Sequence, residues 1–159
     1  RPTNTSFLRL NYYPVSPNPA NTNLDMPLDG HLGIHHHTDA GAVTVLLQDQ
    51  VPGLQFKQGD QWCSVPADPG SLIINLGDLV QVWSNDSYRS PLHRVFANSE
   101  EERFSAAFFM NPVFATECAP LLGDKPRYRT LHWGEYRSKR AAGDYANLGE
   151  EIQVDNYRI

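Results

Sequence analysis

The chain has 159 residues, of which 40% are hydrophobic, so it can bury the core of one domain and is not wholly disordered. The net charge of −5 argues against a nucleic-acid partner, because general nucleic-acid binding needs a basic face. No apolar run approaches the roughly 20 residues that span a bilayer, so no membrane partner is expected. Cys63 and Cys118 lack disulfide or zinc spacing and favour a reducing compartment, so we expect a cytoplasmic protein.

Twelve prolines and eleven glycines divide the chain into short runs that are rich in Val, Ile, Leu and Phe. Short apolar runs separated by turns are typical of the strands of a sandwich or barrel. We predict strands near residues 7–13, 31–38, 42–48, 53–57, 61–65, 71–75, 91–97 and 104–111.

Two segments break this rhythm and predict helices. Apolar residues recur at helical spacing within residues 77–85, which indicates a short helix there. Residues 131–142 predict a longer, basic helix with Gly143 as its stop. The polar tail after Gly143 is expected to pack loosely on the surface.

The densest polar cluster of the chain spans residues 35–39. Side chains alternate in a strand, so His35, His37 and Asp39 would share one face, and His37 and Asp39 could reach one ion. Taken alone, this pair is better explained as a polar strand end in contact with solvent. His93 begins another predicted strand, and two histidines with one carboxylate form the facial triad that binds non-haem Fe(II). The alternative for His93 is a hydrogen-bonded structural histidine.

Arg103 opens the last strong strand and shares one face with Ser105, Ala107 and Phe109. A guanidinium inside an apolar barrel is costly unless it pairs with an anion, and its planar fork suits a carboxylate. The alternative is an arginine at the rim that pairs with the acidic run 100–102 just before it. The local sequence leaves both open.

Four motifs now follow in chain order: Asn-x-Tyr at Asn11 and Tyr13, His-x-Asp at His37 and Asp39, His93, and Arg-x-Ser at Arg103 and Ser105. Their order and spacing resemble those of the Fe(II)/2-oxoglutarate-dependent dioxygenases of the isopenicillin N synthase-like group. The resemblance covers about residues 7–115, with a fainter match in the C-terminal helix, and it includes the segments 37–49, 52–56, 69–78, 90–95 and 103–112.

The resemblance implies a mainly β fold, a double-stranded β-helix or jelly roll with a short C-terminal helix. It implies one catalytic domain over residues 1–159, with the jelly-roll core at about 7–115 and a C-terminal helical extension at about 116–159. Full-length members carry a mostly helical N-terminal half, which we expect to be absent from this chain. The face that it covers would then be apolar and exposed, and a partner chain or a dimer would cover it.

The resemblance also implies the site. His37, Asp39 and His93 would hold Fe(II) as the catalytic centre. The distal carboxylate of the co-substrate 2-oxoglutarate would bind the side chains of Arg103 and Ser105, with Tyr13 and Asn11 beside them. Phe109 would line the substrate pocket, unless it is an ordinary core aromatic.

The implied activity uses dioxygen and couples the oxidative decarboxylation of 2-oxoglutarate to the hydroxylation or desaturation of a small organic molecule. One alternative is an iron oxidase of the same group that needs no 2-oxoglutarate, although the Arg103 and Ser105 pair disfavours it. The other alternative is a non-catalytic binding module that keeps the fold. The sequence does not identify the substrate.

Overall fold

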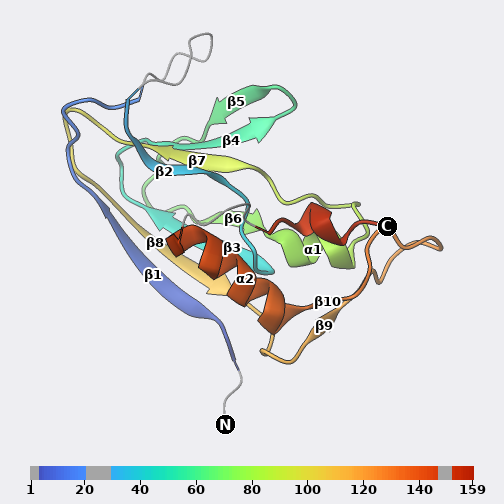
Figure 1. Ribbon diagram of the computed structural model, residues 1–159. Helices are drawn as coiled ribbons and strands as arrows, with labels where there is room; N and C mark the ends of the chain where they lie inside the picture. Colours follow the sequence, from blue (N-terminus) through green and yellow to red (C-terminus); the bar gives the residue numbers. More distant parts are fainter. Residues whose placement is uncertain (1–3, 21–29, 147–151) are drawn as a thin grey trace.

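The computed structural model describes residues 4–20, 30–146 and 152–159, and it contains two four-stranded sheets whose strand pairings are all antiparallel (Figure 1). The first sheet has the order β1-β8-β3-β6, with β1 at Phe7–Tyr13, β8 at Arg103–Met110, β3 at Val43–Gln48 and β6 at Ile73–Leu76. The second has the order β2-β7-β4-β5, with β2 at Leu32–His37, β7 at His93–Phe96, β4 at Leu54–Gln58 and β5 at Gln61–Ser64. Neighbouring strands are therefore mostly distant in sequence, which is the connectivity of a jelly roll.

The eight predicted strands are confirmed, and their ends move by at most two residues. The strands could be predicted because their side chains alternate between two faces. On β8, for example, Arg103, Ser105 and Ala107 are buried while Phe104 and Phe108 are exposed. The fold expected from the motifs, a mainly β double-stranded β-helix, is the observed fold.

Both predicted helices are present, but the second one differs from its predicted bounds. The short helix α1 spans Asp78–Trp83, and α2 spans Trp133–Ala146. Leu131–His132 forms β10, which pairs with β9 at Glu117–Cys118, so the helix begins two residues later than predicted. Among the described helices, none is long and apolar enough to cross a membrane.

Gly143 does not stop α2, as we expected, but lies inside it. A glycine costs about 1 kcal/mol in a helix interior. Burial of Trp133, Tyr136 and Arg140 along α2 offsets this cost, because packing outweighs intrinsic propensity in most protein helices.

The polar tail is also less loose than expected. Val154 and Tyr157 belong to a 3-10 helix, η1 at Val154–Tyr157, and both are buried in the core under the two helices. The Tyr157 ring meets the Tyr136 ring edge-on, with centroids 5.7 Å apart. These two apolar residues therefore pack the polar C-terminal segment against the core.

The outer face of the first sheet is apolar and exposed among the described residues. The exposed fraction is 76% for Leu10 and 59% for Ile74. The other large hydrophobic side chains exposed on this face are Leu8, Tyr12, Leu47, Phe104, Phe108 and Met110. The expected apolar patch is thus present, and continuous patches of this kind mark interaction surfaces.

Asp86 anchors the end of the chain to the segment after α1. Its side chain is 2% exposed, and its carboxylate accepts hydrogen bonds from Arg158 (2.7 and 3.0 Å), Tyr128 and Arg127. The hydrogen bonds from Arg158 are the main reason that the pKa of Asp86 lies well below its usual value, and those from Tyr128 and Arg127 add to the effect. Asp86 adopts a left-handed backbone conformation, φ 70°, so this turn is held by its side-chain bonds.

Replacing Asp86 with Asn should lower the free energy of unfolding by about 2 kcal/mol at pH 7, because bonds between charged groups are lost. A carboxyl group whose folded-state pKa is depressed stabilises the fold fully above its unfolded pKa near 4, and this contribution disappears as the pH falls below that value. Thermal unfolding of both proteins between pH 7 and pH 2 should therefore show a difference in stability that narrows as the pH falls below 4. Asp155→Asn is the matched control, because Asp155 bonds the same arginine from an exposed position and should cost under about 1 kcal/mol.

Candidate active site

A cavity of about 400 Å³ lies between the two sheets and is lined by strands of both. The first sheet contributes side chains of all four of its strands, and the second contributes those of β2, β4 and β7. Most of its wall is apolar, but the seven residues predicted to hold the metal and the co-substrate all face it: Asn11, Tyr13, His37, Asp39, His93, Arg103 and Ser105. An apolar pocket with a few convergent polar groups is the usual form of a small-molecule site.

The strand that carries His37 does not alternate regularly. The pairing of β2 with β7 shifts register between Ile34 and His37, so both of these side chains line the cavity. This corrects the expectation that His35 shares the face of His37, since His35 and His36 are exposed and line only the outer groove. A bulge of this kind re-aims one side chain, and strand periodicity alone does not reveal it.

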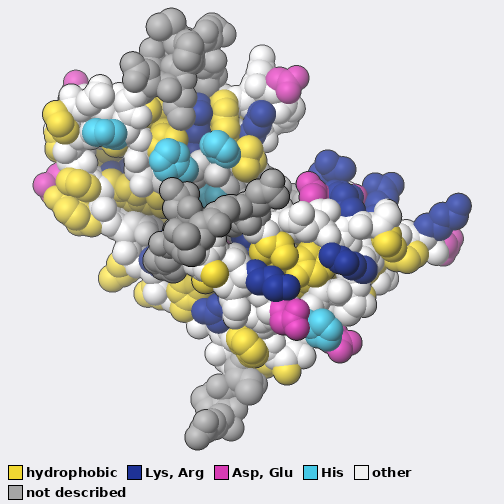
Figure 2. Space-filling view, in the orientation of Figure 1, with side chains coloured by type: hydrophobic (Ala, Val, Ile, Leu, Met, Phe, Trp, Pro, Cys, Tyr) yellow, Lys and Arg dark blue, Asp and Glu magenta, His cyan; other side chains and the backbone are white. Residues whose placement is uncertain are grey.

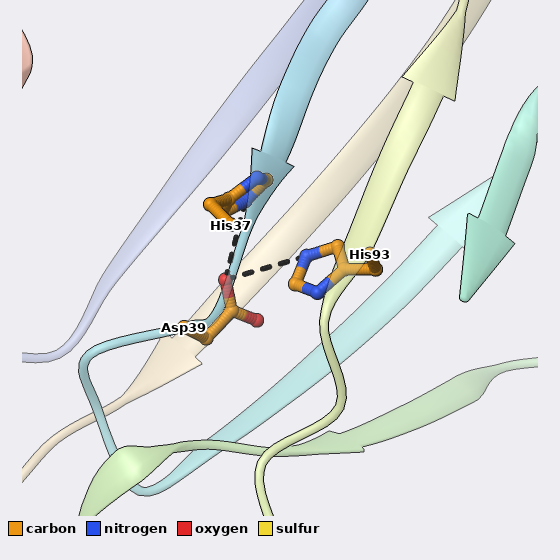
Figure 3. A group of neighbouring side chains, drawn as sticks. All are labelled: His37, Asp39 and His93. Carbon is orange, nitrogen blue, oxygen red and sulfur yellow. Dashed lines mark ion pairs between the residues drawn. The ribbon is translucent and has the colours of Figure 1, made fainter. Parts of the chain in front are cut away.

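His37, Asp39 and His93 converge at one end of the cavity (Figure 3). His37 lies opposite His93 across the β2–β7 ladder, and Asp39 follows β2 in the next loop. The Asp39 Oδ1 atom is 3.7 Å from His37 Nε2 and 3.6 Å from His93 Nε2. These separations exceed a hydrogen bond, and the three potential ligand atoms all lie within 4.8 Å of one another, so one ion fits between them.

Hydrogen bonds fix which ring nitrogens face the cavity. His37 Nδ1 lies 2.8 Å from the His35 carbonyl oxygen, and His93 Nδ1 lies 3.1 Å from that of Pro91. A carbonyl only accepts, so each Nδ1 carries the proton and each Nε2 presents its lone pair toward Asp39. Burial, and then the neighbouring His93, lowers the pKa of His37, which favours the neutral form that binds metals.

The two oxygens of Asp39 have different partners. Oδ2 accepts a hydrogen bond from Thr44 Oγ1 at 2.6 Å and another from Asn75 Nδ2 at 2.7 Å. Oδ1 is the oxygen that faces the two histidines. The carboxylate is thus presented through one oxygen only, as expected for a monodentate ligand that leaves other positions of an ion open.

The loop that carries Asp39 is also held by backbone contacts from α1. The amide of Asp78 donates to the Asp39 carbonyl at 2.8 Å, and that of Leu79 donates to the Gly41 carbonyl at 3.1 Å. At Gly77 a Cβ atom would come within 2.8 Å of the Asp39 carbonyl oxygen and still closer to that of Gly41. Only glycine permits this approach, so the start of α1 fixes the position of the loop.

Arg103 points into the protein and not toward the acidic run at the rim. Its side chain is 1% exposed, with Nε bonded to the Val51 carbonyl at 3.2 Å and Nη2 bonded to Gln48 Oε1 at 3.0 Å. Tyr13 packs beneath it, with the guanidinium carbon 4.9 Å from the ring centroid. The inward orientation is therefore the correct one of the two that the sequence left open.

The remaining donors at this end of the cavity are unused. Arg103 Nη1 is buried and has no hydrogen-bond partner among the described residues. Ser105 Oγ accepts a bond from Asn11 Nδ2 at 3.1 Å, which leaves its own proton available. A buried cationic donor without a partner is costly, so this geometry calls for an anion between Arg103 and Ser105.

Sequence reasoning missed the residues that support these groups: Thr44, Asn75 and Gln48. All three are neutral polar residues that are mostly buried on strands of the first sheet, and this is the signal that could have found them. Phe109 lines the cavity as expected and stacks on Phe7, with ring centroids 4.7 Å apart. It is thus both a wall of the cavity and part of an aromatic pair.

Thr44→Val should weaken the binding of a divalent metal by about 10- to 100-fold, the usual effect of losing a bond that orients a ligand. The side chain keeps its shape but no longer donates to Asp39 Oδ2. Anaerobic calorimetric titration with Fe(II), or titration with Mn(II) in air, measures the affinity. Thr130→Val, at an exposed position, is the control, and equal affinities of the two variants would refute the orienting role of Thr44.

Comparison with known proteins identifies the family of the chain. The model of the 2OG-Fe(II) oxygenase superfamily matches residues 4–112. Gibberellin 2-beta-dioxygenase 8 of Arabidopsis thaliana is 42% identical over 156 residues, which are 97% of this chain and 42% of that protein. Gibberellin 2-beta-dioxygenase 6 of Oryza sativa is 39% identical over 96% of this chain and 40% of that protein. The chain thus spans less than half the length of these curated relatives.

Solved structures lead to the same family. The crystal structure of JOX2 in complex with 2OG, Fe and JA has a TM-score of 0.72 and 37% identity, over 84% of this chain and 38% of that chain. The dioxygenase for auxin oxidation of rice has a TM-score of 0.76 and 25% identity, over 97% of this chain and 51% of that chain. With a family model that matches most of the chain and relatives of about 40% identity, the chain belongs to the 2OG-Fe(II) oxygenase superfamily.

Proposed function

We propose that the protein of which this chain is a part is an Fe(II)- and 2-oxoglutarate-dependent oxygenase that acts on a small organic molecule. His37, Asp39 and His93 hold the iron in this proposal. The observation that carries it is the pairing of this three-ligand cluster with a buried, unpartnered guanidinium in one cavity. Family membership supports it, and so do the relatives named for gibberellin oxidation and the structures named for 2OG and Fe.

The co-substrate lies between the iron and the deep end of the cavity. Arg103 Nη1 and the Ser105 hydroxyl donate to its distal carboxylate, while Gln48 and the Val51 carbonyl keep the guanidinium in place. The Tyr13 ring covers one face of the guanidinium, which strengthens the ion pair by excluding water. Asn11 keeps the Ser105 hydroxyl directed at the anion.

Bound iron supplies the redox chemistry that consumes dioxygen and 2-oxoglutarate, releases succinate and carbon dioxide, and oxidises a C–H bond of the substrate. The chain's own residues do the positioning. Asp39 presents one oxygen, the histidines present Nε2, and the apolar wall that includes Leu46 and Ile73 keeps water from the reacting atoms.

Anaerobic addition of Fe(II) and 2-oxoglutarate should produce the weak visible charge-transfer band of the chelate. His37→Ala should abolish the band. Arg103→Lys should raise the 2-oxoglutarate concentration for half-saturation at least about tenfold, because an ammonium group cannot reproduce the planar fork. Arg89→Lys, at an exposed arginine, should leave the titration unchanged.

Three results separate the proposal from its alternatives. Succinate release that requires 2-oxoglutarate supports the proposed reaction, and turnover without 2-oxoglutarate indicates an iron oxidase of the same family. A normal fold with no band at any 2-oxoglutarate concentration contradicts the proposal and favours a non-catalytic binding module. A band that survives His37→Ala contradicts the ligand assignment.

The exposed outer face of the first sheet supports a second proposal, that a partner chain or a second copy of this chain covers it. Exposure of apolar side chains such as Leu10 and Phe104 to water is unfavourable, so the chain should associate through this face. Light scattering of the purified chain should then give a mass above 17.9 kDa. Leu10→Lys with Phe104→Lys should shift the mass to that of the monomer, and a monomeric wild-type chain contradicts the dimer. The cytoplasmic location stays a prediction.

A further inference from the structure

We propose that α2 holds the loop of the metal ligands in place from outside the cavity, with Arg140 as the positioning residue. Its guanidinium binds the backbone between His37 and Asp39, so the affinity for a metal depends on a side chain that is not itself a ligand. This rests on the proposed function, because the metal is the group that the loop binds.

The two ligands at the end of β2 are joined by Thr38, which lies just beyond the strand. β2 ends at His37, so the Thr38 carbonyl lies past the last pair of the β2–β7 ladder. Arg140 Nη2 donates a hydrogen bond to this oxygen at 2.7 Å. A hydrogen bond from a charged donor is about twice as strong as one between neutral groups. The bond therefore fixes the peptide unit that connects Thr38 to Asp39, directly between the two ligands.

Arg140 differs from the other basic residues of α2. Lys139 is exposed and Arg137 is partly exposed, and Figure 2 shows Lys and Arg side chains at the surface over this helix. Arg140, by contrast, is only 6% exposed. Burial of a guanidinium is costly unless oxygens accept its hydrogen bonds. The oxygens that surround Arg140 therefore explain its position.

The other terminal nitrogen of Arg140 binds the C-terminal segment. Nη1 donates to Gln153 Oε1 at 2.6 Å and to the Ile152 carbonyl at 3.4 Å. Gln153 directly precedes η1, whose first residue, Val154, is buried in the core. The planar fork of a guanidinium can bridge two segments in this way, whereas a lysine ammonium group lacks that geometry. One side chain thus connects the C-terminal segment to the metal loop.

A second contact links α2 to the same loop through α1. Tyr136 precedes Arg140 by about one helical turn, so both lie on the same face of α2. The Tyr136 hydroxyl donates to Asp78 Oδ2 at 2.7 Å, and both side chains are fully buried. The amide of Asp78 in turn donates to the Asp39 carbonyl at 2.8 Å. The successive carbonyls of Thr38 and Asp39 are therefore held by α2, the first directly and the second through α1.

The direction of the effect separates this role from simple electrostatics. Arg140 lines the outer groove that His37 and Asp39 also line. If charge alone acted, removal of a positive charge near a cation site would strengthen cation binding. Loss of the bond to Thr38 instead frees the loop, and metal binding then carries the entropic cost of ordering it. The positioning role predicts weaker binding, and charge alone predicts tighter binding.

Arg140→Gln should therefore weaken metal binding by about tenfold, as when other groups that orient a ligand are lost. Anaerobic calorimetric titration of the full chain with Fe(II), or titration with Mn(II) in air, measures the affinity. Arg140→Lys keeps the charge but not the fork, so its affinity should lie between those of the wild type and Arg140→Gln. Unchanged or tighter binding by Arg140→Gln would overturn the proposal.

Two controls separate position from charge and from stability. Lys139→Gln removes one positive charge from the neighbouring, exposed position and should not weaken metal binding. Asp86→Asn destabilises the fold outside both the cavity and the groove, and it should leave the affinity unchanged. An equal loss in Asp86→Asn would show that general stability, and not the bond to Thr38, sets the affinity. Circular dichroism establishes that each variant is folded.

Hydrogen exchange of the metal-free chain tests the loop itself. Arg140→Gln should speed exchange in peptides that span residues 38–42 by about tenfold, whereas peptides of the β4–β5 hairpin should not change. Tyr136→Phe keeps the ring and removes only the bond to Asp78, so it should speed exchange in the same peptides. It replaces Arg140→Gln in both measurements if that variant does not fold. Unchanged exchange over residues 38–42 would contradict the positioning role.

Failure of this inference can be told from failure of the proposed function. If the chelate band forms and Arg140→Gln binds metal as tightly as the wild type, the oxygenase assignment stands and the positioning role is wrong. If the wild type forms no band but Arg140→Gln speeds exchange over residues 38–42, Arg140 does hold the loop and the oxygenase assignment is wrong.

Discussion

The carboxylate of Asp39 joins two sheets that are hydrogen-bonded separately. One of its oxygens is bound by Thr44 of β3 and Asn75 of β6 in the first sheet, and the other faces His37 and His93 in the second. An ion bound by these three residues would therefore link the two sheets at one end of the cavity.

The arginines that line the cavity have uncharged neighbours. The cavity between the sheets is mostly apolar, yet Arg103 is buried in it with one nitrogen that has no partner among the described residues, a state that a bound anion would stabilise. Neutral partners such as Gln48 hold the guanidinium without neutralising it. The same logic recurs at the mouth, where Arg9 rests on the Phe109 ring and meets no described acid. Both guanidinium groups are therefore held by an amide or an aromatic ring, which leaves their positive charge uncompensated, whereas a carboxylate partner would neutralise it.

The sequence predicted much of the fold and the metal cluster because rare residue types at defined spacing, such as His37 and His93, carry strong signals. It did not reveal Thr44 or Asn75, because neutral polar residues are common in strands and their role depends on which carboxylate oxygen they meet in space. The orientation of both Ile34 and His37 toward the cavity was missed because a register shift is a tertiary property. The C-terminal end of α2 was predicted wrongly because packing of the helix outweighs the low helix propensity of Gly143.

The pairing of β1 with β8 has a consequence for how the protein is made. Phe7 pairs with Phe109 and Tyr13 with Arg103, so the ladder closes a loop of about a hundred residues. On the ribosome, β1 emerges before β8 and has no partner until β8 has been synthesised. Until then β1, which carries Asn11 and Tyr13, has unpaired backbone groups and apolar outward side chains that other chains can contact. The part of the cavity that β1 and β8 line together therefore cannot form until β8 has been synthesised.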